Sequence, residues 1–291
     1  MRVFIWGMTM QANQIFRIPD AGGNRPEGAD VQETVRMAVI GVAQGSGVSF
    51  VAGLLAAWVG QAFSDESVAL VELGTPYFYE AYGIEKRFLY RDFYPFHRLV
   101  AERKNIRGLA NMEQGINWIL RCPGDAPPGG VHEALSPGDS LRLVHNATGT
   151  VRLFDCSGMS AGLMWDILPD MDAVVCVLDP LPTRLCPYIA GIERIRIEAP
   201  RPVFVANNMN RGVHRGELRR FFRGTDWLEL PHVATEDLYR AQYNCVLPYS
   251  IASVRKIVAP VLAELWDRTC GSPDALRTRG TGNGVSKKAK I

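Results

Sequence analysis

The sequence predicts a three-layer α/β fold with a mainly parallel, twisted sheet. From residue 36 onward, short apolar runs of strand length alternate with longer segments of helical period, which is typical of a parallel sheet flanked by helices. The chain has 291 residues, 47% of them hydrophobic, enough for one large core. We therefore expect one domain over 36–270, a strand and turn-rich linker over 1–35, and a disordered basic tail over 271–291.

Each element is expected from the period of its apolar residues. Strands are expected where a short apolar run is bounded by turn-forming residues, at 1–7, 37–42, 67–73, 150–154, 173–178, 202–206 and 227–230. Helices are expected where apolar residues recur at helical spacing, at 48–62, 181–198, 211–222 and 251–269. The region 76–121 should be helical and irregular. An apolar run at 140–145 should form a β-hairpin with 150–154 across the turn residues 146–149.

The composition argues against several classes of function. Lysine and arginine number 32 against 30 acidic residues, a net charge of +2, so nucleic acid is not an expected partner. No uncharged apolar run approaches the roughly 18 residues of a membrane-spanning helix, and residues 1–10 do not resemble a secretory signal. The 6 cysteines show no C-x-x-C spacing, which indicates reduced thiols. We therefore expect a cytoplasmic protein without an integral membrane segment.

Residues 38–56 have the order strand, glycine loop and helix that cradles phosphate. Gly45 and Gly47 permit a tight turn, and such a loop aims backbone N–H groups and a helix N-terminus at an anion. If Gly47 is the last glycine of the Walker A pattern G-x-x-x-x-G-K-[ST], then Val48 replaces the lysine and Ser49 keeps the hydroxyl for Mg²⁺. The sequence therefore predicts a P-loop NTPase-like fold without the loop lysine, its nucleotide contacts made by Gly45, Ser46, Gly47, Val48, Ser49 and Phe50.

Two further apolar strands end in acids. Asp155 precedes a small-residue turn containing Gly158, as in a Walker B strand and the switch after it. Asp155 would hold Mg²⁺ with Ser49 or orient the attacking water, and Gly158 would donate its N–H to a terminal phosphate; an ordinary aspartate turn is the alternative. Glu72 would face the phosphates in a P-loop fold, or hold a ribose hydroxyl in a dinucleotide fold.

Several motifs occur in the order found in the ParA/MinD family of deviant-Walker ATPases, which this chain resembles over about residues 36–268. They are Gly45-x-Gly-Val-Ser, Val-Glu72-Leu-Gly, Leu-Phe-Asp155-Cys-Ser-Gly, Val-Leu-Asp179-Pro-Leu-Pro, Phe-Val-Ala-Asn207-Asn and Glu229-Leu-Pro-His232. The resemblance implies that Asp155 is the Walker B acid, that Glu72 is the acid after the second strand, and that Asn207 reads adenine. Pro231 lies in the stretch that resembles the loop and helix flanking the base. The glycine loop is similar to that of a degenerate branch met beside the CpaE/TadZ pilus-localisation proteins.

Two lysines of that family are missing from this chain. Val48 stands at the P-loop lysine, and neither Ala43 nor Gln44 supplies the signature lysine that crosses the family's dimer to the partner's nucleotide. Because stabilising phosphoryl charge is most of the catalysis in this chemistry, we expect weak binding of ATP or ADP with Mg²⁺ and hydrolysis near background. Three arginines lie near strand or helix ends, although a solvated surface charge is the simpler interpretation of each: Arg36, Arg184 and Arg211.

These observations predict a ParA/MinD-like nucleotide-binding or pseudo-ATPase protein that acts as a localisation or scaffold switch. The resemblance implies a protein partner, and a homodimer could form only through a face that does not need the lysine. One alternative is a dinucleotide-dependent oxidoreductase, although Phe50 stands where G-x-G-x-x-G has its third glycine. A nucleotide-free scaffold is the other. The tail is too rich in glycine to present a membrane-binding apolar face.

Overall fold

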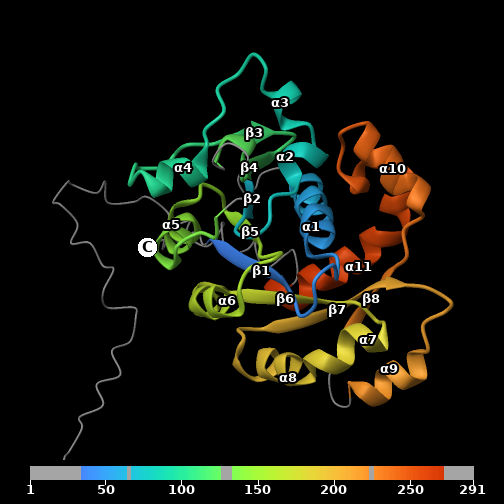
Figure 1. Cartoon of the computed structure of the whole chain (residues 1–291). Helices are drawn as coiled ribbons and strands as arrows, with labels where there is room; N and C mark the ends of the chain where they lie inside the picture. Colours follow the sequence, from blue (N-terminus) through green and yellow to red (C-terminus); the bar gives the residue numbers. More distant parts are fainter. Residues whose placement is uncertain (1–33, 64–66, 126–132, 223–225, 272–291) are drawn as a thin grey trace, which may run out of the picture. The chain divides into compact units, whose positions relative to one another are not determined.

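Figure 1 shows the computed structural model, which describes residues 34–63, 67–125, 133–222 and 226–271. The expected strand at 1–7, the linker and the tail at 272–291 lie outside these residues. The described part contains one sheet of eight strands in the order β3-β4-β2-β5-β1-β6-β7-β8. The strands are β1 (Val35–Gly41), β2 (Val68–Glu72), β3 (Met112–Glu113), β4 (Ile116–Ile119), β5 (Val151–Asp155), β6 (Ala173–Leu178), β7 (Pro202–Met209) and β8 (Trp227–Pro231).

The strand order decides between two expectations for the sheet. All neighbouring strands run parallel except β3 and β4. β1 lies between β5 and β6, so β2, which follows β1 in the sequence, pairs with β5 instead. In the dinucleotide-binding sheet the first two strands are neighbours. The observed order therefore argues against the dinucleotide alternative, and the predicted three-layer fold with a mainly parallel sheet is confirmed.

Helices cover both faces of the sheet (Figure 1). One face carries α1 (Val48–Ala62), α2 (Phe78–Ala81), α3 (Ile84–Arg87), α10 (Thr235–Tyr243) and α11 (Ala252–Cys270). The other carries α4 (Phe96–Ala101), α5 (Pro137–Asn146), α6 (Ala161–Ile167), α7 (Pro182–Leu185), α8 (Ile189–Glu198) and α9 (Arg215–Phe221). None of the helices in the described part of the chain combines the length and hydropathy of a membrane span.

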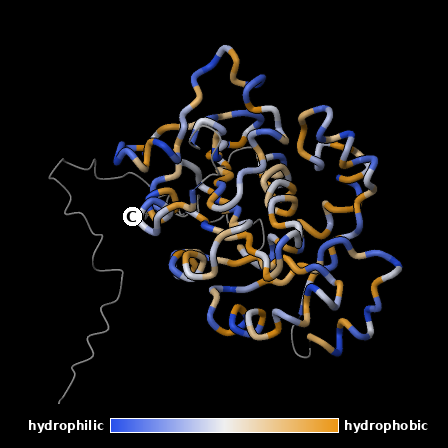
Figure 2. Tube along the Cα trace, viewed as in Figure 1, coloured by the Kyte–Doolittle hydropathy of each residue, from blue (hydrophilic) through white to orange (hydrophobic). Residues whose placement is uncertain are grey.

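The sequence of β1 explains why both faces are covered. Met37 and Val39 belong to one buried cluster, and Ala38 and Ile40 to the other, because successive side chains of a strand point to opposite faces. All four are apolar, as in a strand buried on both sides. Figure 2 shows the same concentration of hydrophobic residues along the central strands and α1.

The β-hairpin predicted for 140–154 is wrong. Residues 137–146 form α5, whose N-cap Ser136 accepts a hydrogen bond from the backbone N–H of Asp139. Leu143 and Val144 form its buried stripe, so the apolar run is helical. A Ser-Pro start with an acid three residues on is a helix N-terminus signal, and it outweighs the short apolar run. β5 then pairs in parallel with β1 and β2.

Two other regions differ in detail from the prediction. The region 76–121 contains β4, whose polar Asn117 is buried because its amide bonds the backbone at Asn111 and Thr148. The predicted helix 181–198 is divided into α7 and α8 by a short 3-10 turn at Cys186–Tyr188. Pro187 lies in that turn and has no N–H to continue a helix.

Candidate functional site

The glycine loop connects the end of β1 to the start of α1. Gly45 and Gly47 adopt φ angles of 75° and 96°, a left-handed conformation that favours glycine. Gly47 directly precedes α1, and no side chain caps the helix or places an acid in its first turn. The N–H groups of this 15-residue helix are therefore open to an anion. Gly41 lets the loop fold back, since a Cβ there would lie 2.3 Å from Ser46 Oγ.

Asp155 and Ser49 meet next to the loop. The Asp155 carboxyl is fully buried; Oδ1 accepts a hydrogen bond from the Ser157 backbone N–H at 2.9 Å, and Oδ2 has no partner. Burial raises the pKa of Asp155, while the Ser157 N–H and the nearby hydroxyls of Ser49 and Ser157 lower it. Ser49 Oγ donates to Ser157 Oγ at 3.0 Å. A buried carboxylate oxygen without a partner beside a hydroxyl fits Mg²⁺, which prefers oxygen ligands and is held by such a pair in P-loop proteins.

This donor set would leave Mg²⁺ with few protein ligands. Within the described residues, no cluster of three or more His, Cys, Asp or Glu side chains is placed to hold a metal. A Mg²⁺ ion bound through one carboxylate usually completes its shell with water and substrate phosphates. When bound, Mg²⁺ would neutralise phosphate charge, and Ser49 and Asp155 would hold it.

Val48 brings no charge to the loop. Its side chain is only 7% exposed and packs with the core on the α1 face of the sheet. A Cβ on Gly41 would lie 2.7 Å from Val48 Cγ2, so the side chain points down against the end of β1. The glycine loop therefore still leads directly into α1, but the position expected for the P-loop lysine holds a buried apolar side chain.

Asn207 contacts the same loop from β7. Its Nδ2 donates to the Ser46 carbonyl at 2.9 Å, and Gly47 leaves room for it, since a Cβ there would lie 2.1 Å away. Asn208 follows with φ 61°, and its Oδ1 lies 2.6 Å from His232 Nδ1, in the stretch after Pro231. The side chain predicted to read adenine thus contacts the glycine loop directly.

Glu72 and Gly158 lie beside the site, and the Glu72 carboxyl is occupied by backbone N–H groups. Glu72 is fully buried, and its two oxygens accept the backbone N–H groups of Tyr77, Phe78 and Arg121. Burial raises the pKa of Glu72 to about 7 against these bonds, and the Asp155 charge adds to the rise. Gly158 packs against Thr75, whose N–H donates to the Ser157 carbonyl at 2.6 Å. Ser157, which is not among the predicted site residues, is the residue of this turn that contacts Ser49.

The three arginines considered from the sequence have different positions. Arg36 lies near the start of β1, at the opposite edge of the sheet, and its N–H and guanidinium contact Asp172. Arg211 is exposed in the segment after β7. Arg184, on α7, reaches the carbonyls of Gln44 and Gly45. Only Arg184 among these three has described contacts with the glycine loop.

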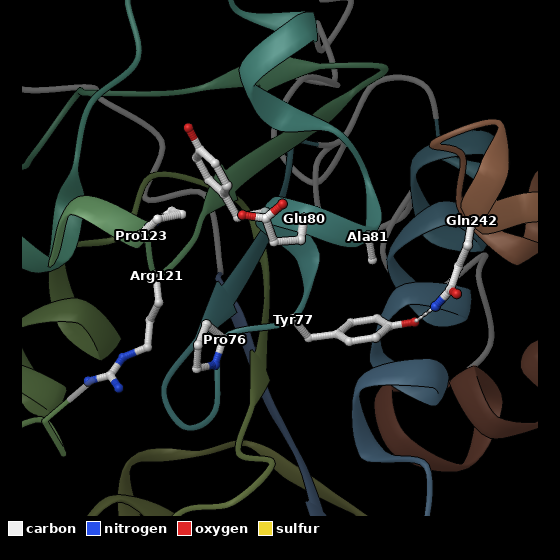
Figure 3. A pocket seen from close by; sticks show the side chains of 8 residues that line it. Pro76, Tyr77, Glu80, Ala81, Arg121, Pro123 and Gln242 are labelled. Carbon is white, nitrogen blue, oxygen red and sulfur yellow. Dashed lines mark hydrogen bonds between the residues drawn. The ribbon is translucent and has the colours of Figure 1, made fainter. Parts of the chain in front are cut away.

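A cavity of about 610 Å³ opens beside the site (Figure 3). It is lined by residues of the segment after β2, of the segment after β4, and of α10: Pro76, Tyr77, Tyr79, Glu80, Ala81, Arg121, Pro123 and Gln242. Tyr77 closes one side, with its hydroxyl 3.4 Å from Gln242 Nε2 (Figure 3). Phe50, predicted to contact nucleotide, is partly buried against the core and lines a second, smaller cavity with Tyr77.

Comparison with solved structures places this arrangement among known folds. A plasmid partition protein from Borrelia burgdorferi bound to AMPPNP matches with a TM-score of 0.60 and 12% identity, over 80% of this chain and 98% of that one. MinD from Pyrococcus horikoshii, complexed with Mg-ADP, matches with a TM-score of 0.58 and 10% identity, over 80% and 96%. This is the fold of the ParA and MinD ATPases. Neither a family model nor a curated protein matches the chain.

The matched region covers nearly the full length of the solved structures. The MinC:MinD complex from Aquifex aeolicus matches with a TM-score of 0.57 and 12% identity, over 88% of this chain and 99% of that chain. The fold brings together, at the carboxyl ends of β1, β5 and β7, most of the residues predicted for the site: Gly45, Ser46, Gly47, Val48, Ser49, Asp155 and Asn207. Parallel sheets bind ligands at this edge.

Proposed function

We propose that this chain is a degenerate ParA/MinD-type nucleotide-binding protein that works as a localisation or scaffold switch. It binds ATP or ADP with Mg²⁺ weakly and hydrolyses ATP at a rate near background. The single observation that carries this proposal is the glycine loop itself, which keeps an open helix N-terminus and the Ser49–Asp155 pair while Val48 is buried in the lysine's place.

Binding and catalysis make different demands on this loop. The N–H groups at the start of α1 and the oxygens of Ser49 and Asp155 support binding of a phosphate with its Mg²⁺. Hydrolysis also needs positive charge where the phosphoryl group develops negative charge, and the loss of such a group removes several kcal/mol of stabilisation, roughly 3 for one donor. Val48 provides none of it.

A switch needs a path from the site to the surface, and the turn after β5 supplies one. Ser157 accepts the hydrogen bond of Ser49 on one side and that of the Thr75 N–H on the other. Thr75 begins the segment that continues into Pro76 and Tyr77 at the cavity of Figure 3. A ligand at Ser49 and Asp155 would therefore bias the position of a surface segment available to a protein partner.

The proposal also includes the cell compartment and the process in which the protein acts. The chain would act in the cytoplasm, in a branch near the CpaE/TadZ pilus-localisation proteins, with pilus assembly as the process served. The motif after β1, glycines followed by valine and serine, supports this placement.

Equilibrium binding of fluorescently labelled ATP, ADP and NAD to the full chain, with and without Mg²⁺, tests the proposal. We expect weak binding of ATP and ADP that Mg²⁺ strengthens, no binding of NAD, and phosphate release no faster than in a protein-free control. Rapid Mg²⁺-dependent hydrolysis that disappears in Asp155→Ala would contradict the pseudo-ATPase assignment. Absence of any nucleotide binding would favour the nucleotide-free scaffold.

A further inference from the structure

We propose that Arg184 supplies the positive charge that the glycine loop lacks, and that it pairs with the phosphates of the bound nucleotide. This inference rests on the proposed nucleotide binding and adds a residue to that site. The charge would come from a different element than in a Walker A loop: from α7, after β6, instead of from the start of α1.

The position of the guanidinium supports this role. Arg184 Nη1 lies 3.3 Å from the Gly45 carbonyl and 3.5 Å from that of Gln44, so the cation is already seated on the loop. Gly45 makes the approach possible, since a Cβ there would lie 3.2 Å from Nη1. An arginine at this place was expected to be a solvated surface charge; Arg184 is 44% exposed, and it contacts the loop as well.

The present partners of Arg184 are exchangeable. Its hydrogen bonds to the two carbonyls are longer than the 2.7–2.9 Å typical of charged donors. Its ion pair with Asp179 Oδ2, at 3.0 Å, involves a side chain that is 44% exposed, and such exposed pairs contribute little. All three described bonds use Nη1, which leaves the other guanidinium donors free for a phosphate. A doubly charged phosphate is a stronger partner than either carbonyl.

Independent polar atoms mark the loop as a ligand site. Asp155 Oδ2 and Ser46 Oγ are both buried without a hydrogen-bond partner, in residues that are 0% and 2% exposed. Buried polar atoms are usually paired, and a bound ion, water or ligand at the loop would give these two their partners. Arg184 on one side of the loop and Asp155 with its Mg²⁺ on the other would together neutralise a di- or triphosphate.

The test compares affinities of the full chain for ATP, inorganic pyrophosphate and adenosine by calorimetry or fluorescence. Arg184→Ala should weaken ATP and pyrophosphate binding by roughly tenfold or more and leave adenosine binding unchanged, because only the phosphates lose a partner. Arg184→Lys should recover part of the loss. Arg196→Ala is the matched control, since Arg196 is exposed on α8 and bonded only to Glu193 among the described residues. Circular dichroism confirms that each variant is folded.

A second variant separates phosphate contact from bracing of the loop. Asp179→Asn releases Arg184 from its carboxylate, so phosphate affinity should stay equal or rise if Arg184 contacts phosphate. If Asp179→Asn weakens binding as much as Arg184→Ala does, the arginine only braces the loop and the inference is wrong. Wild-type binding that Arg184→Ala leaves unchanged overturns the inference and leaves the proposed function intact. A wild-type chain that binds neither ATP nor pyrophosphate overturns both.

Discussion

Glu72 and Asp155 are the last residues of β2 and β5, and they lie opposite each other in the sheet. Their carboxyl groups differ in the hydrogen bonds that they accept. The oxygens of Glu72 are occupied by backbone N–H groups from two segments, so this carboxyl fastens the segments after β2 and β4 to the sheet. Asp155 keeps one oxygen without a partner, so this carboxyl is available to an ion. The sequence identified both acids as candidates, but it contains no signal for which of them the backbone would occupy.

Asp155→Asn should raise stability and abolish the response to Mg²⁺. Burial disfavours the carboxylate, and an amide of the same shape removes that cost while its oxygen still accepts the Ser157 N–H. We expect the free energy of unfolding in EDTA to rise by about 1 kcal/mol. Nucleotide affinity should no longer depend on Mg²⁺. Urea unfolding and binding titrations check this, with Asp166→Asn, an exposed site on α6, as control. A loss of stability in the Asp155 variant would contradict it.

Glu72 should make stability fall with rising pH from about 4.5 until the folded-state carboxyl has ionised just above neutrality. Its folded pKa of about 7 lies above the ordinary value of 4.5, so the folded state binds this proton more tightly and the free energy of unfolding falls as the pH rises through that window. Between pH 6.5 and 8 the fall is roughly 1 kcal/mol. His97, whose pKa burial lowers from 6.5 to about 4, opposes part of this fall near pH 6.5, where the unfolded state still binds its proton in part.

Chemical unfolding at pH 6.5 and 8 measures this contribution. Glu72→Gln cannot ionise and should lose the pH-dependent part, whereas Glu85→Gln, exposed on α3, should keep it. Equal slopes in the wild type and in Glu72→Gln would show that Glu72 is ionised across this range.

At the scale of elements, segments with a long or unbroken apolar run were predicted correctly, and segments with a mixed apolar and polar pattern were not. The predicted helix 48–62 and strand 173–178 have the bounds of α1 and β6, because both segments are nearly continuous apolar runs. β4 was missed because Asn117 interrupts its pattern, and the structure buries this side chain through tertiary hydrogen bonds that no local pattern contains. The hairpin was wrong because α5 is short and amphipathic, and its cap carried the better signal.

Two glycines of α1 should respond oppositely to alanine. At Gly60 the nearest atom to a new Cβ lies 3.7 Å away, so Gly60→Ala should gain about 0.5–1 kcal/mol of stability from helix propensity. At Gly53 a Cβ would lie 2.9 Å from Phe78 and 3.3 Å from Leu247, both packed on this helix. Gly53→Ala should therefore lose roughly 1–3 kcal/mol through overpacking. Thermal unfolding of the pair checks both signs, and a gain at Gly53 would show that α2 and the segment after α10 pack loosely on α1.

At the scale of the whole molecule, strand order assembles the candidate site from distant segments. The glycine loop, Asp155 and Asn207 come from three different strands, and the sequence motifs identified each of them before any contact was known. The contact between Arg184 and the loop could not be predicted, because it depends on how α7 turns back after β6. The inward direction of Val48 is likewise a property of the packed core.

The assembly state should not respond to nucleotide. In the family that the sequence resembles, a signature lysine reaches the partner's nucleotide, and here the corresponding loop positions hold Ala43 and the exposed Gln44. Without a lysine at either loop position, bound nucleotide gains no bridging ion pair when two such faces meet, so it gives no additional drive to association. We therefore expect the same sedimentation coefficient with and without saturating ATP and Mg²⁺ over a range of protein concentrations. A constitutive dimer through another face would sediment alike in both conditions and agree with this expectation. A shift from monomer to dimer on adding ATP would contradict it, and repeating the run with Arg184→Ala would then show whether that arginine bridges the two subunits.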